Sequence, residues 1–290
     1  MSRRKMQRSD KKKKFKLDKD AQQRIEMEFS DVESYDIEEP AAERKKHPFL
    51  RKLIIRSILL CAAVLLINLV IMLYTGQLWF NEPRKRDYPV RGPVITEKEG
   101  KISWNSFAQQ NIQLVFIRAT KSTAYEDENF QTNKSGVTET DLPVGALHIF
   151  DFNMDGKEQA KHFIDVCGNM NGWLKPAVEV KITGFMNLFP TDYDKVSDRL
   201  YDFIEEIKAY YGSEPIIKCS SRTYKNIVSD ERFDNCPVWY ESQYSKIDDN
   251  IRWDFWGYSN RVKFSYYESG DYLEMVLFNG DENEFADMYL

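Results

Sequence analysis

Cysteine and histidine are scarce in this 290-residue sequence, which contains 4 cysteines and 3 histidines. No pair of cysteines has the CxxC spacing, whereas a structural zinc site gathers about four such ligands. We therefore expect neither a metal ion nor another cofactor. The cysteines also form no disulfide framework. A single bond between Cys219 and Cys236 would suit an oxidising compartment, and the sequence leaves it open.

Charge is missing from one long stretch, residues 57–74, which is 18 residues long. The wider segment 53–74 contains only Arg56, near its edge, where the side chain can extend to lipid headgroups. As a helix this segment spans about 33 Å, and a bilayer core is about 30 Å thick. A cleaved signal peptide fits poorly because 52 residues precede the segment. We predict one transmembrane helix over residues 53–74; the alternative is a buried core helix.

Acidic residues dominate the chain after this helix but not before it. Residues 1–52 contain 16 basic and 11 acidic side chains, whereas the whole chain has a net charge of −5. Such asymmetry indicates two compartments, and the basic run 11–14 favours an N-terminus inside the cell. We predict a disordered cytoplasmic tail (1–52), a spacer (75–87) and an extracytoplasmic domain (88–290). No nucleic-acid binding is expected, because acidic residues in the tail offset the basic ones.

From residue 88 onward, short apolar runs rich in β-forming residues alternate with amphipathic segments. Alternation of strands and helices, with continuously apolar strands, is typical of a parallel sheet covered by helices. The predicted helices are 103–110, 157–167 and 192–211, and the predicted strands are 88–95, 113–119, 143–150, 176–182, 214–219, 237–241, 253–258 and 272–278.

Eight such strands in a domain of about 200 residues predict an α/β fold, an irregular (β/α) TIM-like barrel preceded by one transmembrane helix. A doubly wound open sheet is the alternative. In a barrel the active site lies at the C-terminal ends of the strands. The residues predicted at these ends are Thr120, His148, Glu179 with Lys181, Cys219, Glu241, Trp256 and Glu274.

Several motifs in the domain follow one another in the order of a known family. Residues 100–104 (GKISW) fit G-x-I-D-W, residues 116–120 (FIRAT) fit F-[IV]-[KR]-A-[TS], and residues 144–148 (VGALH) fit V-G-A-Y-H. Residues 256–259 (WGYS) fit W-Q-Y-S, and residues 278–280 (FNG) are identical to the closing motif. On these motifs the segment 88–285 resembles the glycoside hydrolase family 25 lysozymes.

This resemblance implies cleavage of the bond between N-acetylmuramic acid and N-acetylglucosamine in bacterial cell walls, but the acids of the family are largely replaced. Val94 stands where the first aspartate of the family belongs, and Lys181 stands where its catalytic glutamate belongs. Lys218 replaces the tyrosine of the motif I-I-Y. Carboxylates remain at Glu179 and Glu274.

The physical consequence is loss of the proton donor. A lysine ammonium has a pKa of about 10.4 and is a poor acid near neutral pH. Lys181 lies two residues after Glu179 on a strand, so both side chains share a face and the cation holds Glu179 ionised. Losing a general acid costs about 10²–10⁴ in rate. We therefore expect hydrolysis to be lost or strongly reduced. An active muramidase with relocated acids, Glu241 or Glu274, is the alternative.

Binding of a glycan needs aromatic faces rather than acids. The predicted substrate contacts are His148, Trp239, Trp256 and Tyr258, although such residues also commonly pack in a barrel core. Together with the predicted membrane helix, the resemblance implies a single-pass protein of the bacterial inner membrane that is associated with peptidoglycan or with an envelope protein. In a third interpretation the barrel is only a platform, and the cytoplasmic tail carries the interaction.

Overall fold

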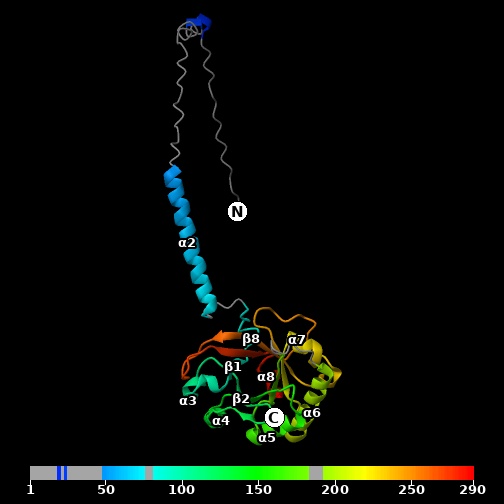
Figure 1. Ribbon diagram of the computed structural model, residues 1–290. Helices are drawn as coiled ribbons and strands as arrows, with labels where there is room; N and C mark the ends of the chain where they lie inside the picture. Colours follow the sequence, from blue (N-terminus) through cyan, green and yellow to red (C-terminus); the bar gives the residue numbers. More distant parts are fainter. Residues whose placement is uncertain (1–17, 21–22, 25–47, 76–80, 183–191) are drawn as a thin grey trace, which may run out of the picture. The chain divides into compact units, whose positions relative to one another are not determined.

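The structure, a computed structural model, describes residues 18–20, 23–24, 48–75, 81–182 and 192–290 (Figure 1). Most of the predicted cytoplasmic tail lies outside these residues. Helix α2 (Pro48–Tyr74) covers the predicted membrane segment and begins five residues before it, at residue 48. None of its residues is buried, so the alternative of a core helix is wrong. With 27 residues, α2 is long and apolar enough to be a candidate membrane span.

The domain that follows is a closed barrel. Eight strands form the ring because β1 pairs with β2 at one end of the sheet and with β9 at the other, which excludes the open doubly wound alternative. Each predicted strand is present. The strands are β1 (Arg91–Ile95), β2 (Val115–Lys121), β4 (Val144–Ile149), β5 (Ala177–Val180), β6 (Ile216–Ser220), β7 (Val238–Glu241), β8 (Phe255–Val262) and β9 (Leu273–Phe278), with β3 (Tyr125–Glu126) appended to β2.

The direction of the last strand corrects the prediction of a parallel sheet. Strands β1 to β8 of the ring run parallel to their neighbours, but β9 runs antiparallel to both β8 and β1. The physical reason is the short connection, residues 263–272, which contains no helix. A parallel crossover needs about a dozen residues or more, usually including a helix, so the chain here returns as a hairpin.

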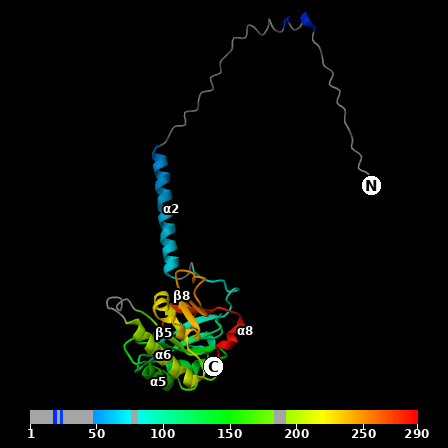
Figure 2. The ribbon, with the colours of Figure 1, turned by 90° about the vertical axis from the view of Figure 1, so that its right-hand side faces the viewer.

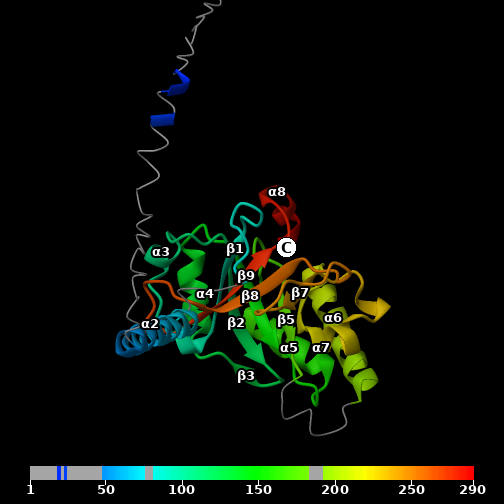
Figure 3. The same ribbon diagram turned by 90° about the horizontal axis from the view of Figure 1, so that it is seen from above.

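Helices cover the outside of the ring, where Figures 1 and 3 show α5 and α6 side by side and α4 packs against β2. Helix α6 (Tyr193–Tyr211) begins where Asp192 caps it and ends where Gly212 takes a left-handed conformation. Figure 2 shows the last helix, α8, at an edge of the barrel away from α6. The remaining helices are α3 (Trp104–Phe107), α4 (Phe130–Thr138), α5 (Gly156–Cys167), α7 (Ser221–Thr223) and α8 (Glu282–Phe285), with short turns η1 (Glu97–Glu99), η3 (Tyr224–Val228), η4 (Glu231–Phe233) and η5 (Ala286–Met288).

The alternation of side chains along each strand separates two cores. One core lies inside the ring, where Phe116, Trp239 and Phe255 pack with ring centroids 4.9–6.3 Å apart. The other lies outside the ring, where Ile117 and Val178 belong to the same cluster as Phe203 of α6. The ring is therefore a packed core and not a pore, so a functional site can only lie at its ends.

Part of the predicted spacer belongs to the domain. Asn81 is buried, and its Nδ2 donates hydrogen bonds to the carbonyl oxygens of Ser242 and Ser245 at 2.9 and 3.0 Å. Arg91 donates to the carbonyl oxygen of Pro83 at 3.2 Å. The segment before β1 is therefore fastened to the loop that follows β7.

A glycine in β1 allows the ring to close, which gives a first prediction. A Cβ atom added to Gly92 would lie 1.7 Å from the carbonyl oxygen of Leu114. We expect Gly92→Ala to lower the free energy of unfolding by about 1–3 kcal/mol, as overpacking of a core does. Urea unfolding of the detergent-solubilised chain, followed by tryptophan fluorescence, measures this. The control Lys121→Ala, at an exposed strand end, should stay within about 0.5 kcal/mol. An equally small effect of Gly92→Ala would contradict the explanation.

Candidate functional site

Glutamates from the ends of three strands surround one buried ammonium, that of Lys218 in a fourth strand, β6. The Lys218 side chain is 1% exposed, and its Nζ lies 2.7 Å from Glu274 Oε1 and 3.0 Å from Glu179 Oε2. Glu241 Oε1 is 3.5 Å away. The three glutamates come from β9, β5 and β7, so this Lys218 cluster ties together four strands of the ring.

Strand register explains why these residues meet. Glu179 and Lys218 are direct neighbours across β5 and β6. Each charged residue stands two positions from an apolar residue of the inner core, so it points to the same side, into the ring. The cluster therefore forms the layer directly above an apolar floor. The floor residues that stand two positions from the four charged ones are Ala177, Ile216, Trp239 and Val276.

Electrostatics keeps the central ammonium charged. Burial by itself would lower the pKa of Lys218, but Glu179, Glu274 and Glu241 together raise it well above its ordinary value. The Nζ also lies 4.8 Å from the centroid of the Trp239 ring, which favours the cation further.

The glutamates differ in protonation. Burial acts to raise the pKa of Glu179, but Lys218 and Lys181 outweigh it and lower the pKa below its ordinary value, so this carboxylate is ionised. Burial raises the pKa of Glu274 to about 7; Lys218 offsets part of the rise, and Glu241 and Glu179 add to it. A quarter of the Glu274 side chain is exposed, but the Oε1 atom that faces Lys218 is buried. Glu274 is therefore the carboxyl group of this cluster best suited to carry a proton near neutral pH.

Lys181 lies at the mouth of the site. Its Nζ is 3.5 Å from Glu179 Oε1 and its side chain is 54% exposed, so the predicted pair Glu179–Lys181 is present. Lys218 is nevertheless the nearer and fully buried partner, which sequence reasoning missed. The available signal was a lone lysine in the apolar strand of residues 216–219. Val94 pairs with Glu274 across β1 and β9, so an apolar side chain lies beside Glu274 in the same layer.

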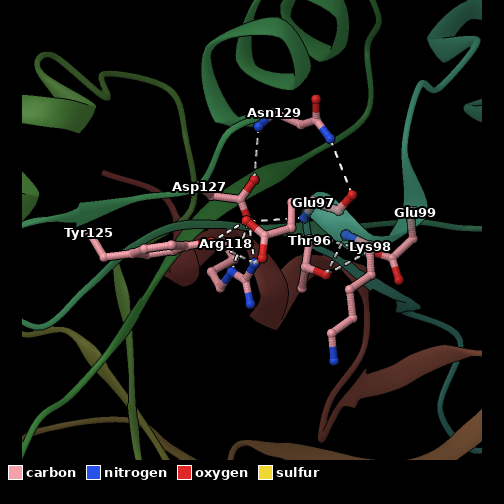
Figure 4. A network of polar contacts seen from close by, with 8 residues as sticks. All are labelled: Thr96, Glu97, Lys98, Glu99, Arg118, Tyr125, Asp127 and Asn129. Atoms are coloured by element: carbon pink, nitrogen blue, oxygen red, sulfur yellow. Dashed lines mark hydrogen bonds and ion pairs between the residues drawn. The ribbon is translucent and has the colours of Figure 1, made fainter.

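A second polar network fixes the rim at the ends of β1 and β2 (Figure 4). Arg118 lies between Asp127 and Glu97, with its Nη2 2.7 Å from Asp127 Oδ2 and 2.9 Å from Glu97 Oε1. The Tyr125 hydroxyl donates to Glu97, and Asn129 Nδ2 donates to the Glu97 carbonyl oxygen at 3.2 Å. The Arg118 guanidinium is thus engaged by two carboxylates, and the network holds the turn after β1 against the hairpin of β2 and β3.

His148, predicted as a substrate contact, is a core residue. It is 0% exposed, its Nδ1 lies 2.7 Å from Thr120 Oγ1, and its ring stacks on Phe203 with centroids 5.0 Å apart. Burial lowers its pKa to about 3, so the ring is neutral. His148 faces the outer helices and not the inside of the ring, so it lies apart from the Lys218 cluster.

The three predicted aromatic contacts also lie outside the mouth of the site. Trp239 is fully buried in the floor beneath Lys218. Trp256 and Tyr258 are buried on the outer face of the ring, because β8 directs its other residues, Phe255 and Gly257, inward. A position at a strand end did not reveal which face the side chain takes.

The Lys218 cluster could be taken for a metal site. Three carboxylates would be suitable ligands for a metal, but the cation they surround is the Lys218 ammonium, and no group of three or more histidine, cysteine or acidic residues suited to hold a metal ion occurs among the described residues.

Cys219 and Cys236 are buried, free thiols, so the disulfide bond left open by the sequence is not formed.

Comparisons with known proteins agree with the barrel fold. The profile of "Glycosyl hydrolases family 25" matches residues 95–266. The structure of a family 25 glycosyl hydrolase from Bacillus anthracis is similar with a TM-score of 0.67 and 28% identity, over 72% of this chain and 97% of that one. The autolytic lysozyme of Clostridium acetobutylicum is 22% identical over 68% of this chain and 56% of its own length. The "Uncharacterized protein YegX" of Escherichia coli O157:H7 is 22% identical over 68% of this chain and 72% of its own length.

The central position of Lys218 gives a second prediction. Lys218→Met leaves three glutamates without their buried cation, so we expect the free energy of unfolding near neutral pH to fall by about 3–5 kcal/mol. The matched control is Lys181→Met, whose half-exposed ion pair contributes about 0–1 kcal/mol. Urea unfolding of both variants measures the difference, and equal effects would show that Lys218 has no special role.

A third prediction concerns pH. The folded-state pKa of Glu274 is about 7 against an ordinary 4.5, so the stability it contributes is complete below about pH 4.5 and is lost as pH rises through about 7. We expect Glu274→Gln to flatten the fall of unfolding free energy between about pH 5 and about pH 8. Surface Glu139→Gln should keep the wild-type slope. Superimposable pH profiles for Glu274→Gln and wild type would refute the raised pKa.

Proposed function

The chain belongs to glycosyl hydrolases family 25, and we propose that it is a membrane-anchored, peptidoglycan-associated member of the bacterial cell envelope whose hydrolytic activity is lost or strongly reduced. The observation that supports this proposal is the Lys218 ammonium among three glutamates at the polar end of the barrel.

The position of this ammonium conflicts with glycoside cleavage. In working glycosidases two carboxyl groups flank the scissile bond, about 5–5.5 Å apart in retaining and about 6.5–9.5 Å apart in inverting enzymes, with substrate or water between them. Here the Glu179 and Glu274 oxygens are both within 3.0 Å of the Lys218 Nζ. An ammonium this close to both carboxyl groups competes for them with the glycosidic oxygen or the water that cleavage requires.

The lack of a proton donor also argues against cleavage. Glu179 is held ionised by two lysines, Lys181 is a cation, and Val94 has no proton to give. Glu274 is the exception, because its raised pKa suits a general acid. This one observation favours the second candidate function, an active muramidase that uses Glu274 or Glu241. Against it, the Glu274 carboxylate is already engaged by Lys218 at 2.7 Å.

The anchoring part of the proposal rests on α2 and on charge. The apolar helix precedes the domain, and the basic residues before it favour a cytoplasmic N-terminus. This orientation puts the barrel on the side of the membrane where peptidoglycan lies. Binding without cleavage would then hold the wall and the membrane together.

A fourth prediction tests the function directly. We expect the detergent-solubilised chain to be retained on insoluble peptidoglycan in a pull-down and to give no clearing of a cell-wall suspension. The double variant Val94→Asp, Lys181→Glu restores two acids of the family but keeps the Lys218 ammonium, so it should also give no clearing. Clearing by this variant would show that the ammonium does not prevent cleavage.

Other outcomes decide between the alternatives. Clearing by the wild-type chain that disappears in Glu274→Gln or Glu241→Gln would establish the active muramidase. Absence of both clearing and retention would favour the platform interpretation. In that case deletion of residues 1–52 alone should produce the same cell phenotype as deletion of the whole chain.

A further inference from the structure

Two non-helical segments cover the outer face of β8 and β9. This face presents Trp256, Tyr258, Met275 and Leu277, and it packs against Tyr88 and Trp253. Tyr88 belongs to the segment 81–88 before β1, and Trp253 belongs to the loop 242–254 between β7 and β8. These residues lie on the outside of the ring and take no part in the Lys218 cluster.

A cavity of about 570 Å³ opens between the two segments. Its volume falls within the range of about 300–1,000 Å³ that is usual for small-ligand sites. Aromatic rings and charged groups of both signs line it. Its lining includes Arg84, Asp87, Tyr88, Lys246, Trp253 and Trp256.

The walls of this pocket are fixed to each other. Tyr88 lies 5.9 Å from Trp253 and 6.5 Å from Trp256, and the two tryptophans are 5.9 Å apart, all between ring centroids. Trp256 Nε1 donates to the Ser242 carbonyl oxygen at 2.9 Å, and Asn81 donates to the same oxygen at 2.9 Å. A ligand would therefore meet a preorganised aromatic surface, because the rings are already locked in place.

The lining selects one class of ligand. A partly exposed tryptophan ring suits the flat apolar face of a pyranose, and flanking charged groups suit hydroxyl and acetamido groups. The exposed charged groups of Arg84, Asp87 and Lys246 favour a ligand with polar groups, because a purely apolar ligand would displace their water without replacing its hydrogen bonds.

We propose that this pocket is a second glycan site, which binds N-acetylhexosamine units outside the barrel mouth; the choice of glycan rests on the proposed function. The segment 81–88 precedes the family match at 95–266, so one wall of the site comes from the part of the chain that leads from α2. The site would give the protein a hold on wall glycan that is independent of the altered cluster at Lys218.

The test uses the full chain in detergent micelles and a tetramer of N-acetylglucosamine as the probe, with binding measured by calorimetry and by tryptophan fluorescence. Trp253→Ala should weaken binding about tenfold or more. Lys246→Ala, an exposed change that leaves the packing intact, should also weaken it. Tyr210→Ala, which removes an exposed aromatic ring from α6, is the control and should bind like wild type.

Each remaining outcome has a defined meaning. Wild-type affinity in both Trp253→Ala and Lys246→Ala would overturn the second site. Binding that is lost in Lys181→Glu but kept in Trp253→Ala would place the glycan at the barrel mouth, overturning this inference while supporting the proposed function. No binding of the tetramer by the wild-type chain also overturns the second site, whereas the proposed function is judged separately by retention on whole peptidoglycan.

Discussion

One buried ammonium allows the polar end of this barrel to exist. Three glutamates from three strands could not lie within 3.5 Å of a common point in a largely buried layer without a cation among them. Lys218 supplies that cation from a fourth strand, and the apolar floor beneath it strengthens every interaction. The charges are therefore interdependent, and a change at one position alters the protonation of the others. The site has to be understood as a unit.

The fold could be predicted from the sequence far better than the site. Buried strands leave continuous apolar runs, and Asp192 and Gly212 mark the ends of α6 chemically, so these elements were predictable. The direction of β9 was not, because an apolar run has no direction and only the length of the preceding connection restricts it. Helix α4 was missed because it buries only Phe130, Asn133 and Val137, too few for a clear periodic pattern.

The site depends on facts that a single sequence does not contain. The pair Glu179–Lys181 could be predicted because alternate residues of one strand share a face. The central role of Lys218 depends on which strands are neighbours in the ring. The outward direction of His148 and Trp256 could not be predicted for a related reason, since a residue at a strand end can face either core. Family membership specifies the barrel, but the side chains at its polar end determine what it can do.

The attachment of Asn81 has a mechanical consequence. Because Asn81 is fastened to the carbonyl oxygens of Ser242 and Ser245, a pull on the chain just before Asn81 is passed to this clamp as well as to β1. The load then passes into the loop that directly follows β7, the strand that ends in Glu241. Part of such a load is thereby delivered next to the strand that contributes one carboxylate to the Lys218 cluster.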